Sequence, residues 1–262
     1  MSKPIRILYV GDSWLTAGTL GAFSSLTYDL RGAMVENQAQ HVIDHWRADP
    51  RFSVDYMTGW DALARFPETP EAIGQYDVIF LSNVESDALV LYPMERSMRA
   101  PMGPNRLKLV REFVRQGGAL AMIGGYATFT GRHNAGNYGG TPIEEVLPVK
   151  CSERNDDRVE TPEGALAQVA DAGHSIMQGL DWSREPIFNG YNRVTLKPHA
   201  QLLARIGDEQ DPLLAVGAFG HGRSLAFTSD IAPHWGAGFQ QWPHAGVFLT
   251  QMALWLAGPN RA

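Results

Sequence analysis

The sequence has a single cysteine, no long apolar run and no block of like charges, and each absence excludes a class of protein. Cys151 alone cannot form an internal disulfide or a Cys-x-x-Cys metal or redox site, so a reducing compartment is the simplest expectation. No apolar run approaches the roughly 18–20 residues of a membrane span. The net charge of −6 argues against nucleic acid as the main partner, because phosphate binding needs a basic face.

What is present indicates a globular cytoplasmic protein. Hydrophobic residues make up 44% of the chain, which is enough to build a full core. A strand-like run begins at Ile5, and we expect no signal peptide before it. No repeat or low-complexity linker divides the 262 residues, so we expect a single domain over 1–262.

The first half of the chain alternates strand-like and helix-like segments. Short apolar runs at 5–10, 52–57, 76–82 and 119–123 predict strands. Residues 28–48 carry apolar side chains at three- and four-residue spacing, which predicts a helix that ends before Pro50. Asn105 is expected to cap a second helix, which Gly117 and Gly118 terminate. This alternation is typical of a parallel sheet flanked by helices.

The pattern changes after Pro148. Short strand-like runs separated by turn residues predict an antiparallel excursion between residues 149 and 220, with a hairpin turn in 217–223. Residues 224–230 predict a further buried strand of the parallel type, and residues 244–257 predict an apolar closing helix. The predicted fold class is therefore α/β, a doubly wound and mostly parallel sheet with an antiparallel excursion.

The unusual polar and aromatic residues follow the predicted strands. Ligands of open parallel sheets bind outside the carboxyl ends of the strands, so we expect the loops 11–14, 82–87, 124–129 and 228–242 to converge there. The candidate catalytic residues are Asp12, Glu85, Tyr126 and His234. The candidate substrate-binding residues are Ser13, Trp14, Asn83, Gly125, Thr128, Asp230 and Trp235.

Each candidate also has an ordinary structural explanation. Asp12 could cap a turn, Trp14, Trp235 and Trp242 could be packing residues, and His234 could fix a loop. A metal shared by His234, His244 and Asp230 is a minor alternative, because spacing alone cannot give its geometry. We predict no metal and no cofactor: the chain has no H-E-x-x-H motif and no G-x-G-x-x-G after a strand.

The turn after the run at 119–123 is the place where many α/β hydrolytic folds carry a nucleophile. Here it reads "GGYATF", so Tyr126, Ala127 and Thr128 occupy it, and the chain has no G-x-S-x-G elbow. The turn could carry an unusual nucleophile, could have lost one, or could be only a tight turn.

Several segments together resemble a known family. They are "GDSW", "QYDVIFLSNV", "PNRLKLVREFVRQGGALAMIGGYATF", "YGGTPIEEVLPV", "GHSIMQGLDW", "GYNRV" and "GHGRSLAFTSDIAPHWGAGF". From about residue 5 to 258 the chain resembles glutamine amidotransferase-like proteins, a group of the class I glutamine amidotransferase-like superfamily akin to the trehalose-utilisation proteins. The resemblance implies a flavodoxin-like α/β sandwich.

The resemblance does not imply glutaminase activity for this chain. Working amidotransferases of the superfamily place a cysteine on the elbow, activated by a late histidine, and thioester chemistry requires that thiolate. Tyr126, Ala127 and Thr128 replace it here, and Cys151 lies beyond Pro148, where we expect a buried small residue. His234 is the counterpart of the late histidine, without the usual His-Pro-Glu pattern.

We therefore expect a protein that binds a small polar, sugar-like molecule at the carboxyl edge of the sheet, and that acts, if it is an enzyme, as a non-thiol hydrolase, lyase or isomerase. One alternative is a non-catalytic scaffold or homo-oligomeric assembly module, with Trp235 and Trp242 at a subunit contact. Another is a metal-dependent hydrolase. Right-handed crossovers further predict that the first and fourth strands lie side by side, so that Asp12, Tyr126 and His234 line one pocket.

Overall fold

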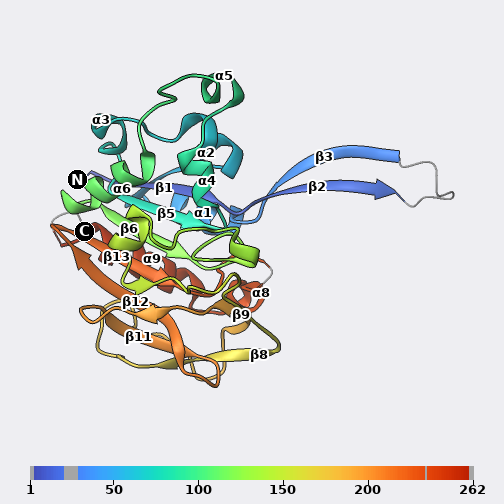
Figure 1. Cartoon of the computed structure of the whole chain (residues 1–262). Coiled ribbons are helices and arrows are strands. Elements are labelled where there is room, and N and C mark those ends of the chain that lie inside the picture. The colour runs from blue at the N-terminus through green and yellow to red at the C-terminus, as the bar shows by residue number, and fades with distance from the viewer. Residues whose placement is uncertain (1–2, 21–28, 234, 260–262) are drawn as a thin grey trace.

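In the computed structural model, which describes residues 3–20, 29–233 and 235–259, a central sheet runs through the whole molecule (Figure 1). The strands are β1 (Ile5–Gly11), β2 (Ser13–Leu20), β3 (Asp29–Asn37), β4 (Phe52–Met57), β5 (Val78–Ser82), β6 (Ala119–Ile123), β7 (Val149–Lys150), β8 (Arg158–Val169), β9 (Ile187–Asn192), β10 (Thr195–Leu196), β11 (Gln201–Ile206), β12 (Asp211–Phe219) and β13 (Gly222–Phe227).

Most of the helices cover the parallel half of this sheet, and α8 (Ala237–Gln241) lies beside β9 in the antiparallel half (Figure 1). The helices are α1 (Gln40–Arg47), α2 (Gly59–Arg65), α3 (Pro70–Ile73), α4 (Ser86–Val90), α5 (Met94–Ser97), α6 (Arg106–Arg115), α7 (Pro142–Val146), α8 and α9 (Ala245–Ala257), with a 3-10 turn η1 (Arg132–Asn134). None of the helices in the described part of the chain is long and apolar enough to cross a membrane.

The nine strands of the sheet follow the order β4-β1-β5-β6-β13-β12-β11-β8-β9. The first five pair in parallel, and their chain order of 2-1-3-4-5 is that of the flavodoxin-like fold. The pairings from β13 through β12, β11 and β8 to β9 are antiparallel. The predicted fold class is confirmed, and the antiparallel excursion between 149 and 220 is confirmed with it.

The parallel strands are apolar throughout because both faces of the sheet are covered. Alternate residues of β1 belong to two different cores: Ile7 and Tyr9 pack with α1 and α9 on one face, and Leu8 and Val10 pack with α2 and α6 on the other. A strand that is buried on both sides has no solvent face to carry polar residues. This is why 5–10 and 119–123 read as continuous apolar runs.

Two of the predicted helix boundaries hold. The Asn105 side chain accepts a hydrogen bond from the Lys108 amide at 3.1 Å and caps α6, which ends before Gly117. The closing helix is α9, and its buried residues face the sheet. The hairpin turn in 217–223 is also present, between β12 and β13.

The helix predicted over 28–48 is wrong in its first half. Residues 29–37 form β3, which pairs with β2 in a separate antiparallel two-stranded ribbon, and only 40–47 are helical. Figure 1 shows this ribbon projecting from the body of the molecule. The pairing partner, residues 13–20, is distant in sequence, so the apolar spacing from Val35 to Trp46 could not reveal it.

The predicted adjacency of the first and fourth strands is also wrong. β5 lies between β1 and β6 and pairs with both. The chain passes from β1 to β4 on one side and then returns to β5 on the other, so the switch in strand order falls at β1 and β5. Ligand sites of this fold are found outside the carboxyl ends of the strands at such a switch.

Candidate functional site at the switch point

Two polar residues stand at the carboxyl ends of the strands that flank the switch. Asp12 follows β1 and Asn83 follows β5, and both have left-handed backbone conformations, with φ of 43° and 44°. Asparagine and aspartate tolerate this region better than other residues with side chains. Each loop therefore turns sharply at the strand end, and the two side chains meet: Asn83 Nδ2 donates to Asp12 Oδ1 at 3.1 Å.

Asn83 also reaches a second carboxylate, from the loop after β13. Its Nδ2 donates to Asp230 Oδ2 at 2.8 Å, so one amide group serves both carboxylates. Tyr9 donates its hydroxyl to the other oxygen of Asp12, and the Ala232 amide donates to Asp230 Oδ1 at 2.8 Å. Residues from three loops, 12, 83 and 230, thus form one buried network.

The glycines of the turn after β6 make this network geometrically possible. β6 lies between β5 and β13, so Asn83 and Asp230 must approach each other across its end. A Cβ on Gly125 would lie 2.0 Å from Asn83 Oδ1, and one on Gly124 would lie 2.1 Å from the Thr228 carbonyl oxygen. Gly125 also has a φ of 151°, which side-chain-bearing residues rarely adopt. The two glycines are therefore required by close packing of the site.

Burial dominates the electrostatics of the two carboxylates. Asp12 and Asp230 are fully buried, and burial raises the pKa of both above the usual range; the negative charge of Asp12 raises that of Asp230 further. The hydrogen bonds from Tyr9 and Asn83 act in the opposite direction on Asp12. A pair of neighbouring carboxylic groups in this setting holds protons more readily than exposed ones do.

A histidine missed by the sequence analysis lies near this pair. His41 of α1 has its Nε2 at 3.0 Å from the Ile231 carbonyl oxygen, beside the Asp230 loop. Burial lowers the pKa of His41, and the charge of Asp12 partly counteracts this. Its position within a predicted helix, with no motif around it, gave no signal in the sequence.

Asn83, Asn192 and Asp157 hold the turn at 124–131 in place. Asn83 Oδ1 accepts from the Ala127 amide at 3.4 Å. Asn192 bonds both backbone groups of Gly125, accepting from its amide at 2.8 Å and donating to its carbonyl at 3.0 Å. Asp157 accepts from the amides of Thr130 and Gly131 and from Asn192 Nδ2. The segment "GYNRV" contained Asn192, but spacing gave no reason to single out either residue.

Tyr126 contacts a second cluster, which includes residues of β8 in the antiparallel half of the sheet. Its hydroxyl donates to Glu160 Oε1 at 3.1 Å, and its ring makes an edge contact with Trp235 at 5.4 Å between centroids. Trp235 is fully buried and donates from Nε1 to Glu160 Oε2 at 3.0 Å, while the Arg158 guanidinium lies 4.8 Å from the centre of the Tyr126 ring. The glycines thus direct Tyr126 to this second cluster.

The other turn and loop candidates have structural contacts. The Thr128 hydroxyl donates to the Ile123 carbonyl at 2.8 Å and is buried. Cys151 is buried in the core, as expected, and burial raises the pKa of its thiol. Trp242 is buried against Trp182. Burial of Trp235 and Trp242 within the chain contradicts the expectation that they form an exposed subunit contact.

His234 lies outside the described residues. Of the three residues predicted to line one pocket, only Asp12 and Tyr126 can therefore be located. Asp12 bonds Asn83, and Tyr126 bonds Glu160. No group of three or more His, Cys, Asp or Glu side chains suited to a metal ion occurs in residues 3–20, 29–233 and 235–259. Asp230 uses its oxygens for Asn83 and the Ala232 amide.

A cavity of about 350 Å³ opens directly beside Asn83 at the switch point. Its lining comes from the first residue of β2, the loop after β5 and helices α2 and α4 with the C-cap of α4: Ser13, Gly59, Trp60, Leu63, Asn83, Glu85, Asp87, Ala88 and Leu91. Three of the predicted site residues, Ser13, Asn83 and Glu85, therefore share one cavity. Asp12 is not among the lining residues and contacts it through Asn83. Trp14, next to Ser13, is exposed.

Some polar groups of this cavity are hydrogen-bonded within the protein, and others are exposed to solvent. Ser13 Oγ accepts from the Gly59 amide at 3.0 Å, which fixes the start of α2 against the start of β2. Glu85 stands at the N-cap position of α4 but its side chain does not cap the helix, and it is exposed. Trp60 is 48% exposed. The side chains that line the cavity thus include an indole, Trp60, and two carboxylates, Glu85 and Asp87.

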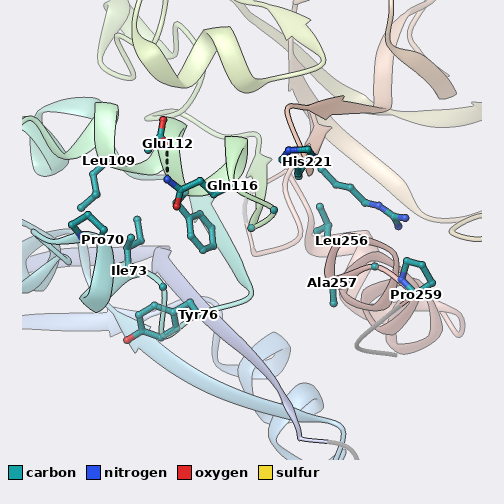
Figure 2. A pocket seen from close by; sticks show the side chains of 17 residues that line it. Pro70, Ile73, Tyr76, Leu109, Glu112, Gln116, His221, Leu256, Ala257 and Pro259 are labelled. Carbon is teal, nitrogen blue, oxygen red and sulfur yellow. Dashed lines mark hydrogen bonds between the residues drawn. The ribbon is translucent and has the colours of Figure 1, made fainter.

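A second cavity, of about 460 Å³, lies at the opposite edge of the sheet (Figure 2). Figure 2 shows Pro70, Ile73 and Tyr76 across it from His221 and Leu256, with Gln116 bonded to Glu112 on the rim. It is lined at the amino ends of β6 and β13 and contains none of the predicted site residues. The cavity beside Asn83 is the one that lies at the switch point.

Fold and site together define a flavodoxin-like α/β protein in which the elbow after the fourth parallel strand carries no cysteine. Residues 6–258 match the model of the family described as "Putative glutamine amidotransferase", and the chain belongs to that family. The resemblance noted in the sequence is thereby confirmed. No curated protein matches the chain.

Solved structures agree with this assignment. Cytoplasmic Protein STM3548 from Salmonella typhimurium is 31% identical, with a TM-score of 0.87 over 96% of this chain and 99% of that one. Cytoplasmic Protein STM1381 from Salmonella typhimurium LT2 is 34% identical, with a TM-score of 0.85 over the same shares. A ThuA-like protein from Parabacteroides merdae, 13% identical, matches 98% of this chain and 91% of its own with a TM-score of 0.57, which shows a shared fold.

Proposed function

We propose that the protein binds a small, neutral, polyhydroxylated molecule of the sugar class in the cavity beside Asn83. The observation that carries this proposal is the composition of the cavity wall: an exposed indole, Trp60, lines the same cavity as the carboxylates of Glu85 and Asp87. Sugar rings present C–H faces that pack on aromatic rings and hydroxyls that donate to carboxylates. The volume of about 350 Å³ lies in the range of small-molecule sites.

Two further features support the proposal. The cavity lies at the switch between β1 and β5, where ligands of this fold class bind. The absence of a cysteine from the turn at 124–128 removes the thiolate that glutamine hydrolysis needs, so a function other than glutaminase has to account for the site. We also propose a cytoplasmic location, the one stated for both Salmonella relatives.

If the bound molecule is transformed, Glu85 is the residue placed to exchange a proton with it. Glu85 borders the cavity and is not engaged in capping α4. Asp12 is buried behind Asn83 and acts as a positioning residue, because its oxygen holds the amide that faces the cavity. Tyr126 is tied to Glu160 and takes no part in this proposal.

Calorimetric titration with a panel of neutral monosaccharides, disaccharides and polyols tests the proposal. We expect saturable binding of at least one compound, weakened about tenfold or more in Trp60→Ala and in Glu85→Gln, which corresponds to about 1.4 kcal/mol. Glu153→Gln is the matched control: Glu153 is an exposed carboxylate that pairs with Lys150 and does not line this cavity, so the variant should bind as the wild type does. No binding by any compound, or equal binding by all variants, would contradict the proposal.

A further inference from the structure

The side chains around the cavity beside Asn83 offer a ligand mainly hydrogen-bond acceptors. The Asn83 amide group has two hydrogens, and both are committed, to Asp12 and to Asp230. Glu85 and Asp87 are exposed carboxylates, which accept hydrogen bonds and cannot donate them when ionised. A ligand in this cavity is therefore held largely through hydrogens of its own, such as those of sugar hydroxyls.

The side-chain donors that remain in the cavity wall are neutral. The Ser13 oxygen accepts from the Gly59 amide, which leaves its hydroxyl hydrogen, and Trp60 contributes an indole N–H. No lysine, arginine or histidine is among the described residues that line the cavity. The wall therefore carries the negative charge of its two carboxylates and no positive side chain beside them.

Two arginines contact the helices of the wall, and both are engaged elsewhere. Arg106 is fully buried and donates to the carbonyls of Ala62 in α2 and Leu89 in α4. Arg65, at the end of α2, pairs with Asp61 at 3.7 Å. Neither arginine lines the cavity. An anion in the cavity would therefore lie beside two carboxylates without a cationic side chain to bind it.

The helix N-termini at the cavity do not reverse this charge. α2 begins at Gly59 and α4 at Ser86, and the partial positive charge of a helix N-terminus attracts anions. Each first turn already holds a carboxylate of the protein itself: Asp61 in α2, which forms a capping box with Thr58, and Asp87 in α4. The positive ends of both helices are thus matched by negative charge within the chain.

We propose, on the basis of the function proposed above, that the protein takes its ligand as the free sugar or polyol, before any phosphoryl transfer to it, and that the site rejects the phosphate ester of the same compound. A phosphate monoester carries a charge of about −1.5 to −2 at neutral pH. Sites that bind such groups supply arginine, lysine or other strong donors. The cavity beside Asn83 supplies Glu85 and Asp87 instead, and like charges at close range repel.

The site accordingly precedes phosphoryl transfer in the use of its ligand. In that class of reaction a sugar hydroxyl attacks the terminal phosphorus of a nucleoside triphosphate, loses its proton and displaces the nucleoside diphosphate. The product keeps the ring that would pack on Trp60. It has lost one hydroxyl hydrogen, however, and has gained negative charge that Glu85 and Asp87 oppose. Phosphorylation therefore removes the compound from the set that this cavity binds.

Calorimetric titration with matched pairs of compounds tests the proposal. Every saccharide or polyol of the panel that binds is titrated beside its own phosphate monoester, as glucose is beside glucose 6-phosphate. Asp87→Asn removes one negative charge from the cavity wall. Glu95→Gln is the matched control, because Glu95 is an exposed carboxylate in the first turn of α5 that does not line the cavity.

We expect each ester to bind the wild type at least about tenfold more weakly than its parent compound, because of the repulsion between like charges. The gap should narrow at least about threefold in Asp87→Asn and as salt rises from about 0.01 M to about 1 M, which shortens the Debye length from about 30 Å to about 3 Å. It should stay unchanged in Glu95→Gln.

Two results overturn this proposal and leave the sugar site in place. One is an ester that binds as tightly as its parent compound. The other is a gap that persists unchanged in Asp87→Asn or at high salt, since the ester is then excluded by its size and not by its charge. Failure of every parent compound to bind contradicts the proposed function itself, which is a different result from either of these.

Discussion

At the scale of single residues, Asn83 has the most consequential position, because one amide group satisfies two buried carboxylates. Asn83→Ala would remove one of the donors to each buried carboxylate and leave Asp12 Oδ1 and Asp230 Oδ2 without the Asn83 hydrogen bond. An unsatisfied buried polar group costs about 1–3 kcal/mol, or more if charged. We expect the free energy of unfolding to fall by at least about 2 kcal/mol in urea denaturation. Asn155→Ala, at an exposed position, should change it by less than about 0.5 kcal/mol; equal effects would refute the role given to Asn83.

The glycines of the turn give a second prediction at this scale. Gly125→Ala places a methyl group 2.0 Å from Asn83 Oδ1 at a φ of 151°, so we expect either no soluble protein or a loss of several kcal/mol. Gly140→Ala is the control: its φ of 69° is also left-handed, but nothing lies within 4 Å of the added Cβ. Its cost should be only the backbone strain of about 1 kcal/mol. Thermal denaturation of both variants separates crowding from strain.

At the scale of secondary-structure elements, Arg106 of α6 holds the walls of the cavity together. Its fully buried guanidinium donates to the carbonyls of Ala62 and Leu63 at the end of α2 and of Leu89 in α4. These carbonyls lie in the last turns of the two helices, where cationic side chains are favourable. A lysine has no planar fork to reach both helices.

We therefore expect Arg106→Lys to lower the free energy of unfolding by about 2–4 kcal/mol and to weaken ligand binding as α2 and α4 move apart. Arg115→Lys on the same helix is exposed and paired with Glu112 three residues away, so it should be nearly neutral. If urea denaturation showed equal losses for the two variants, the assignment of Arg106 to the cavity walls would be wrong.

Secondary-structure elements that depend on local sequence patterns could be predicted, and those that depend on distant pairing could not. The buried strands, the cap at Asn105 and the antiparallel excursion could be predicted, because each depends on local patterns of burial or capping. The ribbon could not, because β3 is defined by pairing with residues about 20 positions away. Trp60 and Arg106 were missed for a related reason: their roles depend on which helices meet around the cavity.

At the scale of the whole molecule, the order of the strands decides which predicted residues meet. With β5 between β1 and β6, Asp12 meets Asn83 rather than Tyr126, and the sequence alone could not exclude the other order. The convergence of loops at the carboxyl edge did follow from the parallel pattern. It brought Asp12, Asn83 and Asp230 together but left Tyr126 and Trp235 in a separate cluster with Glu160.

The buried carboxylate pair also gives the molecule a predicted pH dependence. Because burial raises the folded-state pKa of Asp12 and Asp230, their contribution to stability is fully present below the ordinary pKa near 4 and is lost as pH rises through the raised values. Asp230→Asn removes one buried charge, so we expect a flatter profile and higher stability at neutral pH. Urea denaturation across pH measures this, with exposed Asp208→Asn as control; a profile as steep as the wild type's would contradict the account.

The most direct test of the central claim is a crystal structure of the protein soaked with the saccharide or polyol that binds best in calorimetry. We expect density for the ring in the cavity beside Asn83, stacked on Trp60, with its hydroxyls within hydrogen-bonding distance of Glu85 or Asp87. Density in the cavity at the opposite edge, between Ile73 and His221, with the cavity beside Asn83 unoccupied, would contradict it.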